Sequence, residues 1–529
     1  MTEKRPHDIT VLINLLRIAQ LYHERREKVK KTKAVAVALT VIMILSMAGC
    51  ATPGSWTDDI EQLRAFVLET HPKFTDETLA NLERNTAIRA AFHEALDTLL
   101  TEAPYLTDFE AMVGLQRAIA VLEDNHFNLF LAELEQEEEI AVYPLGFRWL
   151  SDGFYLLTTV EGFEHALNHR LISINGRNIE NIFAEFRTLW SVENIYNARA
   201  TFARLLGNPI LLDAMDLGDE GNIIFDFEND SGDIVALKLT PADESFTDIN
   251  AAVFFPIFPV DNRIAGGLPL FMDIRGGEMT GHNWFKFLAE HEILYIRLEL
   301  YMQNTDETTG MFAPFAQDVK AAFEENTPAA VIIDARHNPG GDNAYLAELF
   351  EFLAHHTDPG RLFHFIDEGA MSASLLGAAH LKSLGAVLLG QPTGQNTEFY
   401  GFHTVTVSDG DIYFTISDLP EDMGPDDYIE IGMGMDEYPY FEVITMTIGE
   451  LHEMIERTNA EAEGMSYTLE LPYSGLLVSV PNMSLSASHI FELELELYTL
   501  RPHVLIAYTI QDWINNRDPL LTYVIELLR

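Results

Sequence analysis

The sequence predicts an α/β (α+β multidomain) protein in which a helical N-terminal region and a β-rich middle region precede an α/β core. The first observation is length, because a chain of 529 residues exceeds the roughly 250–300 residues that one hydrophobic core normally organises. The second is a change in the spacing of apolar residues. They recur every three or four positions in the N-terminal region but form short strand-like runs in the middle region. The third is a strand–helix alternation from Ile293 onward, which typically builds a mainly parallel sheet.

The first 50 residues predict a cytoplasmic extension followed by a lipoprotein signal peptide. A basic cluster, Lys28 to Lys33, precedes fifteen residues without charge, Ala34 to Ala48. This run is shorter than the roughly 20 residues that span a bilayer, but it suits the apolar part of a secretory signal. Small residues then precede Cys50, which resembles the lipid-attachment site of bacterial lipoproteins. The lipoprotein interpretation places the protein in the cell envelope, outside the cytoplasm and anchored to the membrane by its lipid. An uncleaved anchor helix is the alternative, and either way the bulk of the protein lies outside the membrane.

Residues 56–135 predict a helical domain. Apolar residues recur every three or four positions from Trp56 onward, and His71-Pro72 ends the first helix. A later helix, Phe109 to Leu122, stops before Asp124-Asn125-His126.

Residues 140–260 predict a β-rich region. It contains short apolar runs with turn residues between them, and Asn175-Gly176 is a typical hairpin turn. The runs that predict strands are Phe147 to Trp149, Phe154 to Leu157, Leu171 to Ile174, Ile223 to Phe227 and Ile234 to Leu239.

Residues 268–529 predict the α/β core, with an acidic insertion at about 402–466 and a last helix from Thr509. Ligand sites on parallel sheets lie at the carboxyl ends of the strands. The predicted strands are Leu294 to Leu298, Ala330 to Asp334, Leu362 to Ile366 and Val387 to Leu389. The predicted helices between them are Phe312 to Phe323, Tyr345 to His355 and Ser372 to Ser383.

Two turns of this core carry residues suited to chemistry. The first, Asp334 to Asp342, reads Asp-Ala-Arg-His-Asn-Pro-Gly-Gly-Asp, and its paired glycines let backbone N–H groups form a nest for an anionic oxygen. The second, Gly369 to Ser374, places Ser372 at the start of a helix, where free N–H groups favour an oxyanion. Taken singly, a plain strand–helix turn and a helix N-cap explain them equally well or better.

Together the turns resemble the tail-specific-protease and tricorn-core family of serine peptidases. The family pattern is Asp-x-Arg-x-Asn-x-Gly-Gly, then Gly-x-x-Ser-Ala, then Gly-x-x-Thr-Gly, and this chain supplies the third motif as Gly390 to Gly394. The resemblance spans about residues 56–525 outside the insertion. It implies a PDZ-like middle region, a crotonase/ClpP-like α/β catalytic core, and Ser372 as the nucleophile.

The resemblance also indicates which branch of the family applies. The Ser-Lys branch places a lysine near Gly394, where this chain has Gln395 and Asn396. Lys382 lies ten residues along the helix of the serine, about 15 Å away, so it cannot substitute. The tricorn-like branch uses histidine, which His126 matches.

The implied site therefore has Ser372 attacking a carbonyl, His126 removing its proton and Glu496 orienting the imidazole, with Glu494 as an alternative. The N–H groups of Gly340 and Ala373 would stabilise the oxyanion, and Gly341 is an alternative donor.

The resemblance implies a peptide or protein substrate, no cofactor and no metal. A catalytically inactive binding protein on the same scaffold is the alternative, because the lysine is missing and His503 replaces the usual aspartate of the closing turn. A metal site at His355-His356, His403 or the pair His165 and His169 matches no standard spacing, and calcium at the insertion stays open.

Net charge and cysteine content exclude further kinds of partner and of site. The chain has 33 basic and 82 acidic residues, for a net charge of −49, so nucleic-acid binding is not expected. Its single cysteine excludes a disulfide within the chain and a cysteine metal cluster. The sequence leaves the oligomeric state open.

Overall fold

The computed structural model describes residues 54–76, 79, 82–129, 143–218, 222–241, 264–265, 283–301, 315–341, 344–401 and 468–529, with four short strands between 407 and 447. The predicted signal segment 1–50 with Cys50, and also His403, lie outside the described residues. No helix in these ranges combines the length and apolarity that crossing a bilayer requires.

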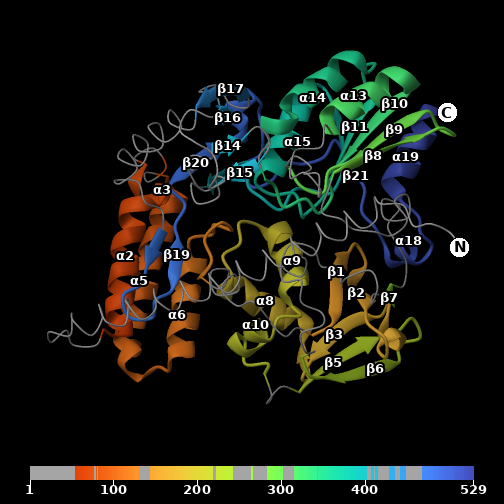
Figure 1. Cartoon of the computed structure of the whole chain (residues 1–529). Coiled ribbons are helices and arrows are strands. Elements are labelled where there is room, and N and C mark those ends of the chain that lie inside the picture. The colour runs from red at the N-terminus through yellow and green to blue at the C-terminus, as the bar shows by residue number, and fades with distance from the viewer. Residues whose placement is uncertain are drawn as a thin grey trace, which may run out of the picture. The chain divides into compact units, whose positions relative to one another are not determined.

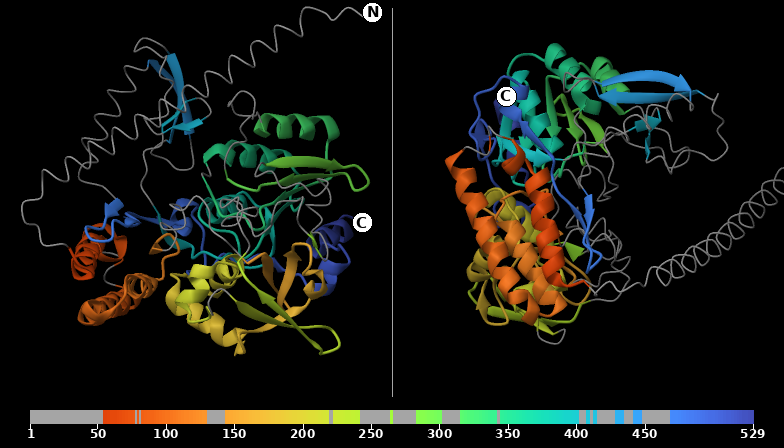
Figure 2. Two further views of the ribbon diagram at one scale, coloured as in Figure 1. Left: turned by 60° about the horizontal axis from the view of Figure 1, so that its bottom comes forward. Right: turned by 90° about the vertical axis from the view of Figure 1, so that its left-hand side faces the viewer.

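The N-terminal region is helical, as predicted. Its helices are α2 (Trp56–Thr70), α3 (Pro72–Thr75), α5 (Glu83–Glu102), η1 (Ala103–Tyr105) and α6 (Asp108–Ala120). The break at proline is confirmed, because His71 is the N-cap of α3 and accepts the N–H of Lys73. A hairpin from the far end of the chain, β18 (Thr468–Glu470) and β19 (Leu477–Ser479), packs against these helices (Figure 2).

The middle region contains one antiparallel sheet in the order β1-β2-β3-β5-β6. Its strands are β1 (Leu145–Leu150), β2 (Gly153–Thr159), β3 (Arg170–Ile174), β4 (Arg177–Asn178), β5 (Ile223–Glu228), β6 (Ile234–Leu239) and β7 (Ile264–Ala265). All five strands predicted here are present.

The middle region also contains helices that the sequence analysis did not predict. These are η2 (Glu164–Ala166), α8 (Ile179–Leu189), α9 (Ile195–Leu205) and α10 (Pro209–Ala214). Helix α8 buries apolar residues three and four apart, so its pattern was readable. Helix α9 packs against β1 (Figure 1).

The core sheet has the order β21-β12-β11-β10-β9-β8, and all its pairs are parallel except β8 with β9. Its strands are β8 (Trp284–Leu288), β9 (Ile293–Arg297), β10 (Ala330–Asp334), β11 (Leu362–Ile366), β12 (Val387–Gly390) and β21 (Val504–Leu505). Strands β9, β10 and β11 are buried along their whole length, which explains their continuous apolar runs.

Helices cover both faces of this sheet (Figure 1). One face packs against α13 (Phe315–Asn326), α14 (Ala344–His356) and α15 (Ala373–Ser383), and the other against α19 (Pro519–Leu528). The single last helix predicted from Thr509 is two helices, because Thr509 caps the short α18 (Ile510–Ile514) and Asp518 caps α19. A short α17 (Ala487–Ile490) lies earlier in the chain.

One small sheet joins the two ends of the predicted insertion, and another lies within it. Strand β13 (Glu398–Gly401) pairs with β20 (Met483–Ser486), so the chain before and after the insertion lies side by side. Between them, β14 (Val407–Asp409), β15 (Ile412–Phe414), β16 (Tyr428–Gly434) and β17 (Phe441–Thr447) form a separate antiparallel sheet.

Candidate active site

Ser372 occupies a strained turn between β11 and α15. Its backbone has φ +50° and ψ −124°, a conformation that residues with a side chain rarely adopt. Its side chain makes no capping hydrogen bond to the helix, so a simple N-cap role does not explain the residue. A strained strand-to-helix turn that presents a serine hydroxyl is the arrangement of a nucleophile elbow.

The glycine turn after β10 lies directly against this serine. Gly340 has φ +116°, and a Cβ atom added to it would lie 2.7 Å from Ser372 Cβ and 2.9 Å from the Met371 carbonyl oxygen. The Met371 N–H donates to the Asn338 carbonyl oxygen at 3.3 Å. The close approach requires glycine at position 340 and fixes the two turns to each other.

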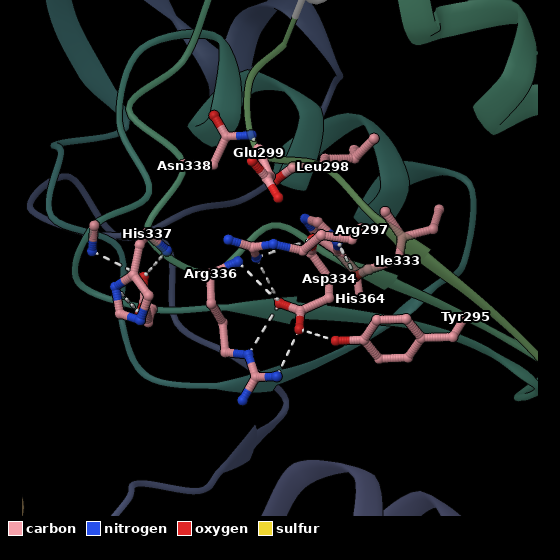
Figure 3. Close-up of polar contacts among 12 residues, drawn as sticks. Tyr295, Arg297, Leu298, Glu299, Ile333, Asp334, Arg336, His337, Asn338 and His364 are labelled. Carbon is pink, nitrogen blue, oxygen red and sulfur yellow. Dashed lines mark hydrogen bonds and ion pairs between the residues drawn. The ribbon is translucent and has the colours of Figure 1, made fainter. Parts of the chain in front are cut away.

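A buried ion network holds the first turn in place (Figure 3). The Asp334 carboxylate accepts from the Arg336 Nε atom at 2.9 Å, from Arg297 at 3.2 Å, and from the Tyr295 hydroxyl. Arg336 also reaches Asp518 of the α19 cap at 2.7 Å. Burial alone would raise the pKa of Asp334, but the two arginines hold it well below its usual range. The turn is therefore anchored to β9 and to the cap of α19.

The predicted oxyanion donors differ in availability. The Gly340 N–H donates to the Asn338 side-chain oxygen at 2.9 Å, so this donor is occupied in the present conformation. The Ala373 N–H opens α15 and therefore has no acceptor within the helix. Gly341, the predicted alternative, is exposed with φ +129°.

Gln395 joins the serine to the histidine. Its side-chain oxygen accepts the backbone N–H of Ser372, and its nitrogen lies 3.3 Å from His126 Nδ1. The same nitrogen donates to Glu193 Oε1 at 2.8 Å. Gln395, one of the two residues near which the Ser-Lys resemblance would place a lysine, thus lies beside Ser372.

His126 is a largely buried imidazole beside this amide. Its side chain is 18% exposed and stacks on Phe399, with ring centroids 6.0 Å apart. Burial lowers the pKa of His126, while the nearby carboxylate of Asp124 opposes the shift. The ring is therefore neutral at neutral pH, which is the form that can accept a proton.

Asp124 belongs to the same turn as His126, and its carboxylate lies close to the His126 ring. Its Oδ1 atom accepts the His126 backbone N–H at 3.0 Å and lies 3.9 Å from His126 Nδ1. Its Oδ2 atom lies 3.1 Å from the buried ring of His71. Burial raises the pKa of Asp124, but His71 and His126 outweigh it and hold the pKa below its usual value.

Glu193 is a site residue that the sequence analysis missed. It lies in the loop between α8 and α9, is 5% exposed, and accepts the Asn396 N–H at 2.8 Å. Burial, with the charge of Asp124, raises the pKa of Glu193 to about 8. The residue stands 202 positions from Gln395 in sequence, and no local pattern around it indicates a role.

The structure pairs the predicted carboxylate, Glu496, with Arg501 at the protein surface. Its side chain is 62% exposed and accepts from Arg501 Nε at 2.7 Å. Its backbone does lie near the site, because the Glu496 carbonyl oxygen accepts the Thr397 hydroxyl at 2.7 Å. The alternative Glu494 is also exposed.

One cluster in the described part of the chain has ligand atoms spaced for a metal ion. Asp124, His126 and Glu193 each contribute an atom, and all three lie within 4.8 Å of one another. Every carboxylate oxygen of the two acids already contacts a protein nitrogen atom, from His71, His126, Gln395 or Asn396. A hydrogen-bond network therefore accounts for the cluster.

Comparison with known proteins gives the fold. No family model and no curated protein matches the chain. Among solved structures, mature CPAF complexed with lactacystin superposes with a TM-score of 0.52 at 11% identity, covering 90% of this chain and 97% of that chain. Mature CPAF alone gives 0.50 at 12% identity, covering 90% and 96%. The photosystem II D1 C-terminal processing protease gives 0.37 at 12% identity, covering 86% and 93%, a score too low to support a conclusion.

At 11% to 12% identity, these likenesses establish the fold alone. The chain has the multidomain α/β fold that its motifs predicted through their resemblance to the tail-specific-protease and tricorn-core family.

Proposed function

We propose that the protein is a serine peptidase that cleaves peptides or protein tails through an acyl-enzyme at Ser372. The observation that carries the proposal is the strained Ser372 turn, packed against Gly340 and joined to His126 through the Gln395 amide. A buried, neutral histidine one side chain from a strained serine suits general-base activation of a hydroxyl.

In this proposal the Ser372 hydroxyl attacks the substrate carbonyl carbon while His126 takes its proton. His126 then gives the proton to the leaving amine, and water hydrolyses the acyl-enzyme. Asp124 stabilises the imidazolium that forms, because its carboxylate lies 3.9 Å from His126 Nδ1 and is ionised. Asp124 thus takes the role that the family resemblance gives to Glu496.

The oxyanion forms beside the Ala373 N–H and the glycine turn. The Gly340 N–H joins it when it leaves the Asn338 side chain, to which it donates at 2.9 Å. One such donor is typically worth about 3 kcal/mol of transition-state stabilisation.

A catalytically inactive binding protein is the second candidate. Gln395 favours it, because its side-chain oxygen takes the backbone N–H of Ser372, and its amide cannot act as a base as a lysine can. The two candidates predict opposite results with a reagent that reacts only with activated serines.

A fluorophosphonate probe separates the candidates. The peptidase forms a covalent adduct at Ser372, and Ser372→Ala abolishes it. The control is Ser374→Ala, which changes a buried serine two residues away on α15. Folded protein that takes up no probe would reject the peptidase and support the binding protein.

We also propose that the protein is anchored outside the cytoplasm through an acylated Cys50, from the basic and apolar segments that precede it. Expressed in bacteria, the wild type should sediment with membranes, and metabolic labelling with a fatty acid should mark it. Cys50→Ala should remove the label, and a wild type without label would reject the anchor.

A further inference from the structure

Met371 directly precedes Ser372 in the strained turn, at a position that the Gly-x-x-Ser-Ala pattern leaves unspecified. Its side chain contacts two buried asparagines from other parts of the chain. The sulfur atom accepts the side-chain N–H of Asn197 at 3.2 Å and that of Asn125 at 3.7 Å. A thioether sulfur is a weak acceptor, so two buried amides here depend on a weak partner.

Each asparagine connects the sulfur to a residue of the site. Asn125 immediately precedes His126, and its side-chain oxygen is buried without a partner among the described residues. Asn197 of α9 is fully buried, and its side-chain oxygen accepts the backbone N–H of Glu193 at 3.3 Å. Met371 therefore joins the turn of the nucleophile to the turn of the histidine and to the loop of Glu193.

The side chain of Met371 also borders a cavity that lies between β1, α9 and the two turns. The cavity measures about 60 Å³, and a single water needs about 10–15 Å³ by this measure. Hydrogen peroxide has only two oxygen atoms, so it fits this space. Met371 is 9% exposed, whereas Met215 is fully buried, so a small oxidant reaches Met371 more readily.

Resting on the proposed peptidase function, we propose that Met371 is an oxidation site at which a peroxide inactivates the enzyme. A lone pair of the sulfur atom attacks one oxygen of hydrogen peroxide, and an S–O bond forms as the O–O bond breaks. The proton of the transferred oxygen passes to the departing oxygen, which leaves as water. The sulfur loses two electrons and becomes a sulfoxide, and the peroxide is reduced.

The sulfoxide oxygen does not fit the present arrangement. It attaches at a lone pair of the sulfur, which is where the two amides now direct their N–H groups. An N–H···O bond alone needs about 2.9 Å between nitrogen and oxygen, but the sulfur lies only 3.2 Å from the Asn197 nitrogen. Asn197 is fully buried and holds Glu193, so Met371 shifts instead and displaces the adjacent Ser372.

The test treats the folded wild type with hydrogen peroxide, removes the peroxide, and measures both oxidation and labelling. Peptide mapping by mass spectrometry should find the sulfoxide at Met371 before Met215 is oxidised. The rate of fluorophosphonate labelling of Ser372 should fall about tenfold or more in step with the oxidation of Met371, because a displacement of about 1 Å can cost 100-fold in rate.

Substitutions locate the effect, and each variant is compared with its own untreated rate. Met371→Leu has no sulfur, so peroxide should leave its labelling rate unchanged. Met371→Gln places an amide oxygen where the sulfoxide oxygen would lie, so it should label slowly even without peroxide. Met483→Leu removes a partly exposed methionine of β20 and should remain as sensitive as the wild type. If Met371→Leu does not fold by circular dichroism, Met371→Gln decides by itself.

A reduced Met371 in the treated protein, or full labelling of protein whose Met371 is oxidised, would overturn the oxidation site. An equal loss of labelling in Met371→Leu and the wild type would do the same, and each of these results leaves the peptidase in place. A wild type that takes up no probe before treatment would reject the peptidase. Mapping would then decide the oxidation site alone, with preference for Met371 over Met215 supporting it and no preference rejecting it.

Discussion

At the scale of single residues, the chemistry of the site depends on how burial and neighbouring charges determine the charge of each titratable group. His126 is neutral because burial lowers its pKa, whereas Asp124 beside it stays ionised because two histidines favour its charge. Burial, with the charge of Asp124, raises the pKa of Glu193 to about 8. Three titratable groups within 4.8 Å therefore differ in charge at neutral pH, which suits a base, a stabilising anion and a neutral hydrogen-bond partner.

The carboxylate that assists His126 can be identified by substitution. Asp124→Asn should slow fluorophosphonate labelling of Ser372 at least about tenfold, because the forming imidazolium loses its nearby anion. Glu496→Gln should stay within about twofold, because that side chain is 62% exposed and pairs with Arg501. Melting temperatures check that both variants fold. A large effect at Glu496 with none at Asp124 would contradict the assignment and return the role to Glu496.

The pH profile of labelling should report His126 and Glu193 separately. The rate should rise with pH through a midpoint below 6.5, because His126 acts only when deprotonated and its pKa is lowered. Glu193→Gln should match the wild type between about pH 6 and 7, where Glu193 is protonated and resembles glutamine.

Above pH 8, Glu193 ionises in the wild type alone, and its charge should favour the imidazolium. The wild type should then label faster than the variant. Curves that coincide from pH 6 to 10 would show that Glu193 has no ionisation in this range.

At the scale of elements, the two turns after β10 and β11 form one unit. Parallel neighbouring strands bring their carboxyl ends to the same edge, and the contact of Gly340 with Ser372 closes the unit. Continuous apolar runs made these strands predictable. The spacing of apolar residues in α8 also predicts a helix, but strand-like runs on both sides of it favoured the interpretation of the whole region as β-rich.

Gly340 offers a test of this unit with an internal control. Gly340→Ala places a methyl group 2.7 Å from Ser372 Cβ, so it should displace the nucleophile and slow labelling at least about tenfold. Gly360→Ala has the same kind of positive φ, +75°, but nothing within 4 Å of the new Cβ. The positive φ should cost each variant about 1 kcal/mol of stability, and the clash should cost Gly340→Ala more, whereas Gly360→Ala should label normally. Equal labelling of the two variants would contradict the packing of the turns.

At the scale of the whole molecule, the site combines four distant parts of the chain. Ser372 comes from the core, His126 follows the N-terminal helices, Glu193 comes from the middle region, and Gln395 follows β12. Motif order predicted Ser372 and His126, and the missing lysine drew attention to Gln395. Glu193 could not be predicted, because its role arises only when the α8–α9 loop packs beside residues some 200 positions away.

The C-terminal helix should stabilise the core through its buried cap. Asp518 caps α19 and pairs with the buried Arg336 at 2.7 Å, so Asp518→Ala should cost about 3–5 kcal/mol of unfolding free energy. Glu228→Ala removes an ion pair with Arg170, whose side chain is 48% exposed, and should cost about 0–1 kcal/mol. Denaturant unfolding measures both. A cost at Asp518 no larger than at Glu228 would contradict the anchoring role of the network.

The labelling rate of Ser372 in His126 variants tests the central claim most directly. At pH 7.5, peptide mapping by mass spectrometry should find the fluorophosphonate on Ser372 in the wild type, and His126→Ala should lower its rate about 100-fold or more. His165→Ala, which changes a histidine of η2, should label as fast as the wild type. A label on another serine, or an unchanged rate in folded His126→Ala, would contradict a histidine-activated Ser372.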